Sequence, residues 1–220
     1  LPGDVNQPII YMVERLRDGG SFTTRRITAI QNGKAIFNMA ASFQKEEKGI
    51  DHQIDMPKVP MPDDLITDYE LLELYKDQVP PITKAYLSLP RPIEFRPVEK
   101  NYILYDGNHE PLRHVWMKAK GLLPDSANIH RAALAYASDY NLLTTAMKPH
   151  SIAVNKVMLA SLDHAMWFHR DFRMDEWLLY ALDSPSASNA RGFTRGSVFD
   201  QSGRLVASVV QEGLIRVLKG

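Results

Sequence analysis

The stretch SFTTRRITAIQNGKAIFNMAASFQ, residues 21–44, decides how this chain folds. Asn32-Gly33 lies between two runs rich in strand-forming residues, and this dipeptide is the strongest short-range signal for a tight β-hairpin. The run before it, PIIYMVERLRDG at residues 8–19, leads into the turn signal Asp18-Gly19-Gly20. The first part of the chain therefore predicts three antiparallel strands.

The same pattern returns near the other end of the chain. The run IIY at residues 9–11 falls on LLY at residues 178–180, one residue out of step with the matches that follow it. At an offset of 170 residues the matched pairs are Thr24 and Thr194, Arg25 and Arg195, Gln31 and Gln201, Gly33 and Gly203. Because both windows read as strand, glycine-containing turn and strand, the sequence predicts a duplicated unit.

Composition excludes several classes of function. The 220 residues carry 26 basic and 26 acidic side chains, and this balance argues against nucleic acid or an anionic membrane as the main partner. The chain has no cysteine, so disulfides, thiol catalysis and thiolate metal sites are excluded. No apolar run approaches membrane-spanning length and no signal-peptide pattern is visible, which favours a cytoplasmic enzyme or binding protein.

The middle of the chain separates the two repeats. MPKVPMP at residues 56–62 is typical of a linker, and residues 65–89 read as helical until Pro80-Pro81. A helix is expected over 126–140, and strands are expected from about residue 153 onward. The predicted domains are residues 1–55, a linker with a helical segment at 56–90, and residues 91–220.

The predicted helix over 126–140 carries a carboxylate in apolar surroundings. Helical spacing puts one set of residues on a common apolar face: Ile129, Ala132, Ala133, Tyr136, Ala137, Tyr140 and Leu143. Asp139 lies at the border of this face, where it would be partly desolvated. Two interpretations remain open: Asp139 accepts hydrogen bonds from the following loop with Asn141, or it serves as a general base.

Several motifs together resemble the acyl-CoA thioesterase II family. They are YASDYN at 136–141, LDHAMWFHRDF at 162–172, EWLLYALDSPSASNARGF at 176–193 and GRLVASVVQEGLIR at 203–216, and residues 16–44 match the first half of the same family. The resemblance implies an α+β tandem double hotdog, in which each antiparallel sheet wraps around a central helix. The repeat places the counterpart of the predicted helix before residue 1, so the first hotdog is expected to be incomplete at its N-terminus.

The resemblance also implies the chemistry. In the family an Asp, a Thr or Ser, and a Gln activate the water that hydrolyses acyl-CoA to fatty acid and CoA; by motif these are Asp139, Ser161 and Gln211. Threonine is commoner at the position of Ser161, which makes its role the least secure. Alternation along LVASVVQEGLI places Gln211 on an inward, apolar face. Its counterpart in the first repeat is Ala41, which predicts one working site, with no cofactor and no metal.

Alternative assignments remain open. Asp163 shares a strand face with Ser161 and is a rival base. Hotdog hydratases carry Asp-x-Asn-x-x-His, but here the sixth position of the motif that begins at Asp139 is Thr144, which breaks the acid–base dyad. A non-catalytic protein that binds acyl-CoA is the third possibility.

The expected partners are acyl-CoA and further copies of the chain. The family implies a dimer or tetramer of double hotdogs. His164 and His169 invite a metal hypothesis, but no third ligand completes a known spacing. The coenzyme phosphates could meet a set of strand arginines: Arg25, Arg26, Arg191 and Arg195.

Overall fold

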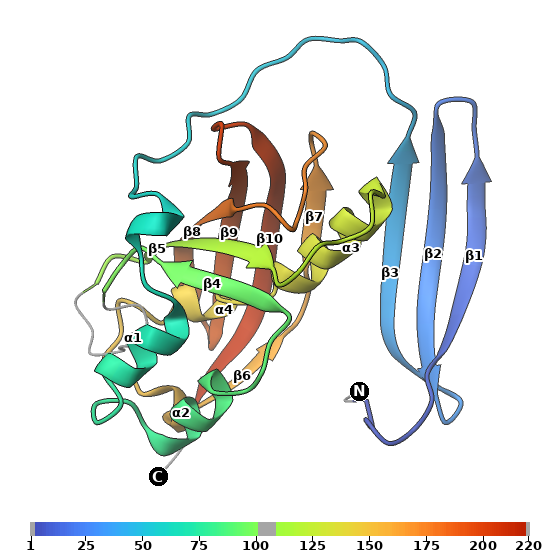
Figure 1. The fold of residues 1–220 in the computed structure, drawn as a ribbon. Helices are drawn as coiled ribbons and strands as arrows, with labels where there is room; N and C mark the ends of the chain where they lie inside the picture. Colours follow the sequence, from blue (N-terminus) through green and yellow to red (C-terminus); the bar gives the residue numbers. More distant parts are fainter. Residues whose placement is uncertain (1–2, 101–108, 219–220) are drawn as a thin grey trace. The chain divides into compact units, whose positions relative to one another are not determined.

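A computed structural model describes residues 3–100 and 109–218 (Figure 1). The chain divides into two compact units, Leu1–His52 and Gln53–Gly220. None of the helices among the described residues is long and apolar enough to cross a membrane.

The first unit is a three-stranded antiparallel sheet in the order β1-β2-β3. Its strands are β1 (Ile10–Asp18), β2 (Phe22–Gln31) and β3 (Lys34–Gln44). Asn32 and Gly33 connect β2 to β3 with φ angles of 51° and 72°. Positive φ at both central residues is the backbone that a twisted two-residue hairpin requires, so the predicted hairpin is confirmed.

The second unit is built on a seven-stranded antiparallel sheet in the order β4-β5-β8-β9-β10-β6, with β7 also paired to β10. Its strands are β4 (Ile93–Pro97), β5 (Leu112–Ala119), β6 (Val157–Ser161), β7 (Ala165–Phe168), β8 (Leu178–Ser188), β9 (Arg191–Asp200) and β10 (Leu205–Val217). β6 and β7 pair with different halves of β10, so the loop between them crosses the middle of that strand.

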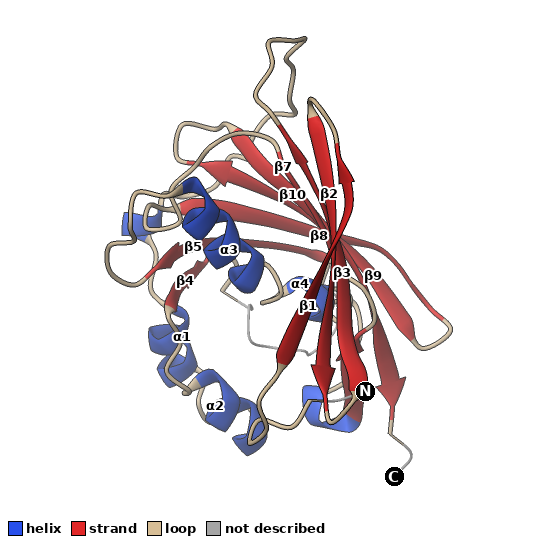
Figure 2. Cartoon of the chain, turned by 90° about the vertical axis from the view of Figure 1, so that its right-hand side faces the viewer, coloured by secondary structure: helices blue, strands red, loops and turns tan. Residues whose placement is uncertain are grey.

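Helices cover one face of this sheet, as Figure 2 shows for α3 and α4. The helical segments are η1 (Pro62–Asp64), α1 (Asp68–Leu74), α2 (Pro81–Leu87), α3 (Ala127–Ala137), α4 (Leu142–Thr145) and η2 (Val154–Lys156). α1 ends before Pro80, as predicted, and α2 begins at Pro81, a position where the missing N–H of proline costs no helical hydrogen bond. A capping box between Thr67 and Glu70 fixes the start of α1.

The sheet buries side chains on both faces. Leu134 of α3 and Leu142 of α4 pack with Tyr180 and Val209 in the main core. On the opposite face Trp116 and Phe199 form a second cluster, which is covered by side chains of residues 56–65. The Trp116 indole N–H donates to the Pro60 carbonyl at 2.9 Å, which holds this segment against the sheet.

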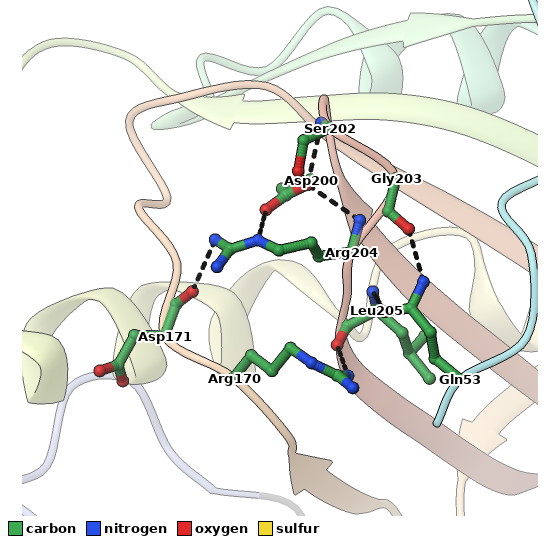
Figure 3. A network of polar contacts seen from close by, with 8 residues as sticks. All are labelled: Gln53, Arg170, Asp171, Asp200, Ser202, Gly203, Arg204 and Leu205. Atoms are coloured by element: carbon green, nitrogen blue, oxygen red, sulfur yellow. Dashed lines mark hydrogen bonds and ion pairs between the residues drawn. The ribbon is translucent and has the colours of Figure 1, made fainter. Parts of the chain in front are cut away.

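A polar network attaches the start of the second unit to the β9–β10 turn (Figure 3). The Gln53 amide donates to the Gly203 carbonyl at 2.8 Å and accepts the Leu205 N–H at 3.0 Å. The Asp200 carboxylate accepts the backbone N–H groups of Ser202 and Arg204. The side-chain amide of Gln53 therefore pairs with backbone groups of the turn and of the first residue of β10.

The helix that carries the candidate carboxylate differs from its prediction in length and orientation. α3 ends at Ala137, and its buried residues are His130, Leu134 and Ala137. Ile129 and Tyr136, expected to be buried, are exposed. The helix is rotated relative to this prediction, because the buried His130 has a hydrogen-bond partner in the interior: its Nδ1 accepts the Met174 N–H at 3.0 Å. Hydrophobic periodicity does not detect a buried, hydrogen-bonded histidine.

The two repeats have the same pairing register. Glu14 pairs with Arg26 as Asp183 pairs with Arg195, and a bulge follows at the same place in β1 and β8.

This register makes Tyr11 the counterpart of Tyr180. In β2 it differs by one residue from the offset of 170 found in the sequence, so Thr24 corresponds to Phe193 and not to Thr194. The connection from Phe199 to its partner Leu205 is one residue longer than the connection from Ile30 to its partner Ala35, which restores the offset in the third strand. Ala41 therefore stays the counterpart of Gln211: Ala41 pairs with Arg25, and Gln211 pairs with Thr194.

Candidate active site

Asp139, Ser161 and Gln211 lie together in the second unit. The Gln211 Nε2 group donates to Asp139 Oδ1 at 2.7 Å and to Ser161 Oγ at 2.8 Å. The Ser161 hydroxyl lies 3.4 Å from the same carboxylate oxygen. The three residues that the resemblance selected, far apart in the sequence, thus form one hydrogen-bonded group.

Two adjacent strands position Gln211 and Ser161. Ser161 ends β6 and pairs with Gly213 of β10, which makes it a diagonal neighbour of Gln211. Gln211 is 0% exposed and faces inward, as alternation predicts. The Thr194 hydroxyl donates to the Gln211 carbonyl at 3.3 Å across the β9–β10 pair.

The orientation of the Gln211 amide follows from its partners. An ionised carboxylate only accepts hydrogen bonds, so the amide group nearest Asp139 is the NH₂. Both hydrogens of Nε2 are then used, one on Asp139 and one on Ser161. Ser161 Oγ accepts from Gln211 and donates its own hydrogen to Asp139 Oδ1 at 3.4 Å. The amide therefore holds the carboxylate and the hydroxyl at a fixed spacing.

Asp139 lies in the turn between α3 and α4. The sequence predicted that it lies on a helix, and this prediction is wrong. Ser138 caps α3, and Asn141 adopts a left-handed conformation with φ 69° before α4 begins. Asparagine tolerates this conformation better than most residues. Because the helix ends before it, Asp139 is an exposed residue and not a half-buried one.

A pair of glycines lets α4 approach the sheet beside Gln211. Gly192 and Gly213 face each other across β9 and β10. A Cβ atom at Gly213 would lie 2.5 Å from Leu143 Cδ2, and one at Gly192 would lie 2.7 Å from the Ala146 Cβ. A close backbone approach at Gly192 and Gly213 therefore positions the turn that carries Asp139.

Sequence reasoning did not single out Tyr180 and Ser138, which support the site from inside. Tyr180 is fully buried, and its hydroxyl donates to the Ser138 carbonyl at 2.9 Å. A Cβ atom at Gly196 would overlap the Tyr180 ring, so this glycine makes room for the tyrosine. Glycines inside strands signal a close approach, and Gly192, Gly196 and Gly213 could have marked this region.

The other candidates have different partners. Asp163 Oδ1 accepts the Glu212 N–H at 2.8 Å. Thr144, at the histidine position of the hydratases, accepts a hydrogen bond from Arg113 at 3.0 Å and donates to the Asn141 carbonyl at 3.2 Å. These contacts occupy Asp163 and Thr144 with structural hydrogen bonds.

The arginines considered for phosphate binding form ion pairs within their own sheets. The pairs are Arg25 with Asp18, Arg26 with Glu14, Arg191 with Glu212, and Arg195 with Asp183. Nothing in these contacts assigns a phosphate site.

The two histidines of the metal hypothesis bond to different serines. His164 Nε2 lies 2.9 Å from Ser138 Oγ, and His169 Nε2 lies 2.8 Å from Ser208 Oγ. Within residues 3–100 and 109–218 there is no group of three or more histidine and carboxylate side chains that could hold a metal ion.

Comparison with known families matches most of the chain. Residues 88–214 match the family described as acyl-CoA thioesterase, and residues 1–44 match the acyl-CoA thioesterase N-terminal domain. Human acyl-coenzyme A thioesterase 8 is 39% identical over 224 residues, covering 98% of this chain and 70% of the relative. Acyl-CoA thioesterase 2 of Haemophilus influenzae is 37% identical over 218 residues, covering 98% and 76%.

Solved structures are similar as well. An acyl-CoA thioesterase II from Mycobacterium marinum matches with a TM-score of 0.81 and 42% identity, covering 99% of this chain and 77% of that chain. A protein with a hot dog fold from Alicyclobacillus acidocaldarius matches with a TM-score of 0.73 at 17% identity, covering 96% and 74%, and supports the fold alone.

These likenesses define an α+β double hotdog enzyme, and the predicted fold class is confirmed. The chain belongs to the acyl-CoA thioesterase family, whose reaction is the hydrolysis of acyl-CoA thioesters.

Proposed function

We propose that the enzyme cleaves acyl-CoA with a water molecule that Asp139 activates and that Gln211 and Ser161 help to hold. The observation that carries this proposal is the shared amide contact, 2.7 Å to Asp139 and 2.8 Å to Ser161. An exposed carboxylate beside a buried amide can meet water from one side while its orientation is fixed from the other. Fixed orientation matters because water is a weak nucleophile.

The reaction then proceeds by a single attack. The water oxygen bonds to the thioester carbonyl carbon while one water proton passes to Asp139. The tetrahedral intermediate breaks its C–S bond, and Asp139 returns the proton to the leaving sulfur. The products are a free fatty acid and CoA. The buried Gln211 Oε1 has no hydrogen-bond partner among the described residues. Because buried polar atoms are normally paired, this oxygen would accept a hydrogen bond from the substrate or from a water molecule at the site.

The proposal extends to the arrangement of the chain. Residues 1–55 would belong to a first hotdog, 56–90 to a linker and 91–220 to the second hotdog, which holds the single site. The shared register of the two repeats supports this division. Asp139→Ala should lose the activity while replacements at Ala41 leave it intact, because the first repeat contributes no reacting group.

A dimer or tetramer acting in the cytoplasm completes the proposal. The family resemblance supports this oligomer. Large apolar side chains that share one face of the three-stranded sheet do not support it, because by the shared register this face corresponds to the helix-covered face of the second sheet. These side chains are Tyr11, Val13, Phe37, Met39 and Phe43. The native mass in solution and cell fractionation test these two points.

The test of the chemistry is CoA release from a panel of acyl-CoA chain lengths. Asp139→Ala should lower kcat by about 10²- to 10⁴-fold, the usual contribution of a general base. Asp163→Asn is the matched variant, because an asparagine Oδ1 can still accept the Glu212 N–H. Asp163→Asn should therefore retain activity.

Each alternative has its own outcome. Loss of activity in Asp163→Asn with retention in Asp139→Ala would make Asp163 the base and refute the assignment. Binding of acyl-CoA without release of CoA would establish the non-catalytic alternative.

A further inference from the structure

The loop between β6 and β7, residues 162–164, begins directly after Ser161 and is attached to β10. The N–H groups of Leu162 and Asp163 donate to the Glu212 carbonyl at 3.0 and 3.3 Å. The Asp163 carboxylate accepts the Glu212 N–H at 2.8 Å. Both backbone groups of the residue next to Gln211 are therefore bonded to this loop, and Ser161 cannot shift relative to Gln211 without breaking these bonds.

The next residue of the loop, His164, bonds to the other side of the site. Its Nε2 lies 2.9 Å from the hydroxyl of Ser138, the buried residue directly before Asp139. The Ser138 hydroxyl also lies 2.9 Å from the Ala135 carbonyl and 3.3 Å from Met166 Sδ. A carbonyl only accepts, and it is a better acceptor than a thioether. Ser138 therefore donates to Ala135, and the His164 Nε2–H donates to Ser138.

The charge state of His164 agrees with this direction. Burial lowers the pKa of His164, although the carboxylates of Asp139 and Asp163 oppose the shift. A neutral imidazole carries one ring proton, and the acceptor at Nε2 places that proton on Nε2. The hydrogen bond is thus present at neutral pH without a charge on the ring.

Ser138 is held from a third direction by Tyr180. The Tyr180 hydroxyl donates to the Ser138 carbonyl at 2.9 Å, and burial raises the pKa of Tyr180 so that it keeps this proton. The turn that presents Asp139 is fixed at its first residue by one bond from the sheet core and one from the Ser161 loop.

We infer that His164 is a positioning residue for the hydrolysis: through its bond to Ser138 it sets the placement of the Asp139 carboxylate relative to Ser161 and Gln211. This inference rests on the proposed function, because it assumes that Asp139 takes the proton. His164 itself contacts none of the three proposed catalytic residues in the hydrogen bonds of the site. Its effect is on the distance and angle at which they meet.

The test compares steady-state kcat and KM for His164→Leu and His164→Gln in the full chain, with an acyl-CoA substrate. Leucine removes the donor, and the misplaced carboxylate should lower kcat roughly 10- to 100-fold with little change in KM. Glutamine places an amide N–H near the position of the imidazole Nε2 and should recover most of kcat.

His169→Leu is the matched control. It removes a histidine–serine hydrogen bond of 2.8 Å in the same sheet, but its partner Ser208 is not adjacent to Asp139, Ser161 or Gln211. Thermal midpoints of all variants separate misfolding from misplacement. His164→Leu and His169→Leu should lower the midpoint by similar amounts, while only His164→Leu lowers kcat.

The outcomes distinguish this inference from the proposed function. Wild-type kcat in folded His164→Leu, together with an inactive Asp139→Ala, would overturn the positioning role and leave the chemistry standing. Failure of His164→Gln to recover kcat in a folded protein would overturn it as well. An active Asp139→Ala would instead refute the chemistry itself.

Discussion

The sheets β1–β3 and β8–β10 have the same pairing and the same bulges, yet their corresponding faces differ in burial and in composition. Tyr180 is 0% exposed, whereas its counterpart Tyr11 is 62% exposed. Gln211 corresponds to Ala41 in the first repeat. The two repeats therefore share one backbone arrangement. At this pair of positions the second repeat has an amide that can hold a carboxylate, and the first repeat does not.

Glycines account for much of the difference. The cross-strand pair Gly192–Gly213 corresponds to Thr23–Phe43 in the first repeat. Because Gly192 and Gly213 have no side chains, Leu143 and Ala146 can approach β9 and β10. This approach brings the turn that carries Asp139 close to Gln211. The bulkier pair in the first repeat would keep such a helix away. The site depends on small residues as much as on polar ones.

The largest effect should come from making the second repeat resemble the first at Gln211. Gln211→Ala removes the donor shared by Asp139 and Ser161, and we expect kcat/KM for acyl-CoA to fall about 100-fold or more. The reverse change, Ala41→Gln, should add no activity, because none of the described residues 3–52 forms a turn like the one that carries Asp139. Equal activity of Gln211→Ala and wild type would remove the functional distinction between the repeats.

The next effect concerns the glycine pair. Gly192→Ala places a Cβ 2.7 Å from the Ala146 Cβ, which has no rotamer that relieves the clash, so the end of α4 must move away from the sheet, and overpacking of this kind costs about 1–3 kcal/mol. The unfolding midpoint in urea should fall and activity should fall with it. Gly20→Ala is the control, because a Cβ at Gly20 meets nothing within 4 Å. Similar midpoints for both variants would show that the packing of α4 does not depend on the absence of a side chain at this glycine.

Much of this difference could be predicted from the sequence, and part of it could not. Asn32-Gly33 identified the hairpin because a tight turn needs that backbone, and alternation placed Gln211 inward. The end of α3 was missed, because YASDY continues the helical spacing while Asn141 turns the chain. The buried face of α3 was missed because alanines on every side of the helix carry little information about orientation.

The equivalent tyrosines of the two repeats, Tyr180 and Tyr11, give a smaller effect. Tyr180→Phe leaves the Ser138 carbonyl without its donor, which should cost about 1–2 kcal/mol of stability and lower kcat through the Asp139 turn. Tyr11→Phe should change neither quantity, because Tyr11 is exposed. Thermal unfolding and kcat of the two variants measure this contrast. A larger loss in Tyr11→Phe would mean that the first repeat buries its tyrosine as the second does.

The smallest effect is expected at the equivalent ion pairs. Asp183 lies 2.6 Å from Arg195, whereas Glu14 lies 3.8 Å from Arg26, and these side chains are largely exposed. Asp183→Asn should cost less than about 1 kcal/mol, and Glu14→Gln should cost less still. Salt should reduce both differences, since it screens exposed charges. Unfolding at low and high ionic strength provides the measurement, and a cost that salt leaves unchanged would point to packing.

The most direct measurement is the single-turnover rate of CoA release by Asp139→Asn. The amide keeps the size of the carboxylate and an oxygen that can accept from Gln211, but it cannot take a proton from water. We expect acyl-CoA to bind with unchanged affinity and the rate to fall by about 10²- to 10⁴-fold. A rate equal to that of the wild type would contradict the claim that this carboxylate activates the attacking water.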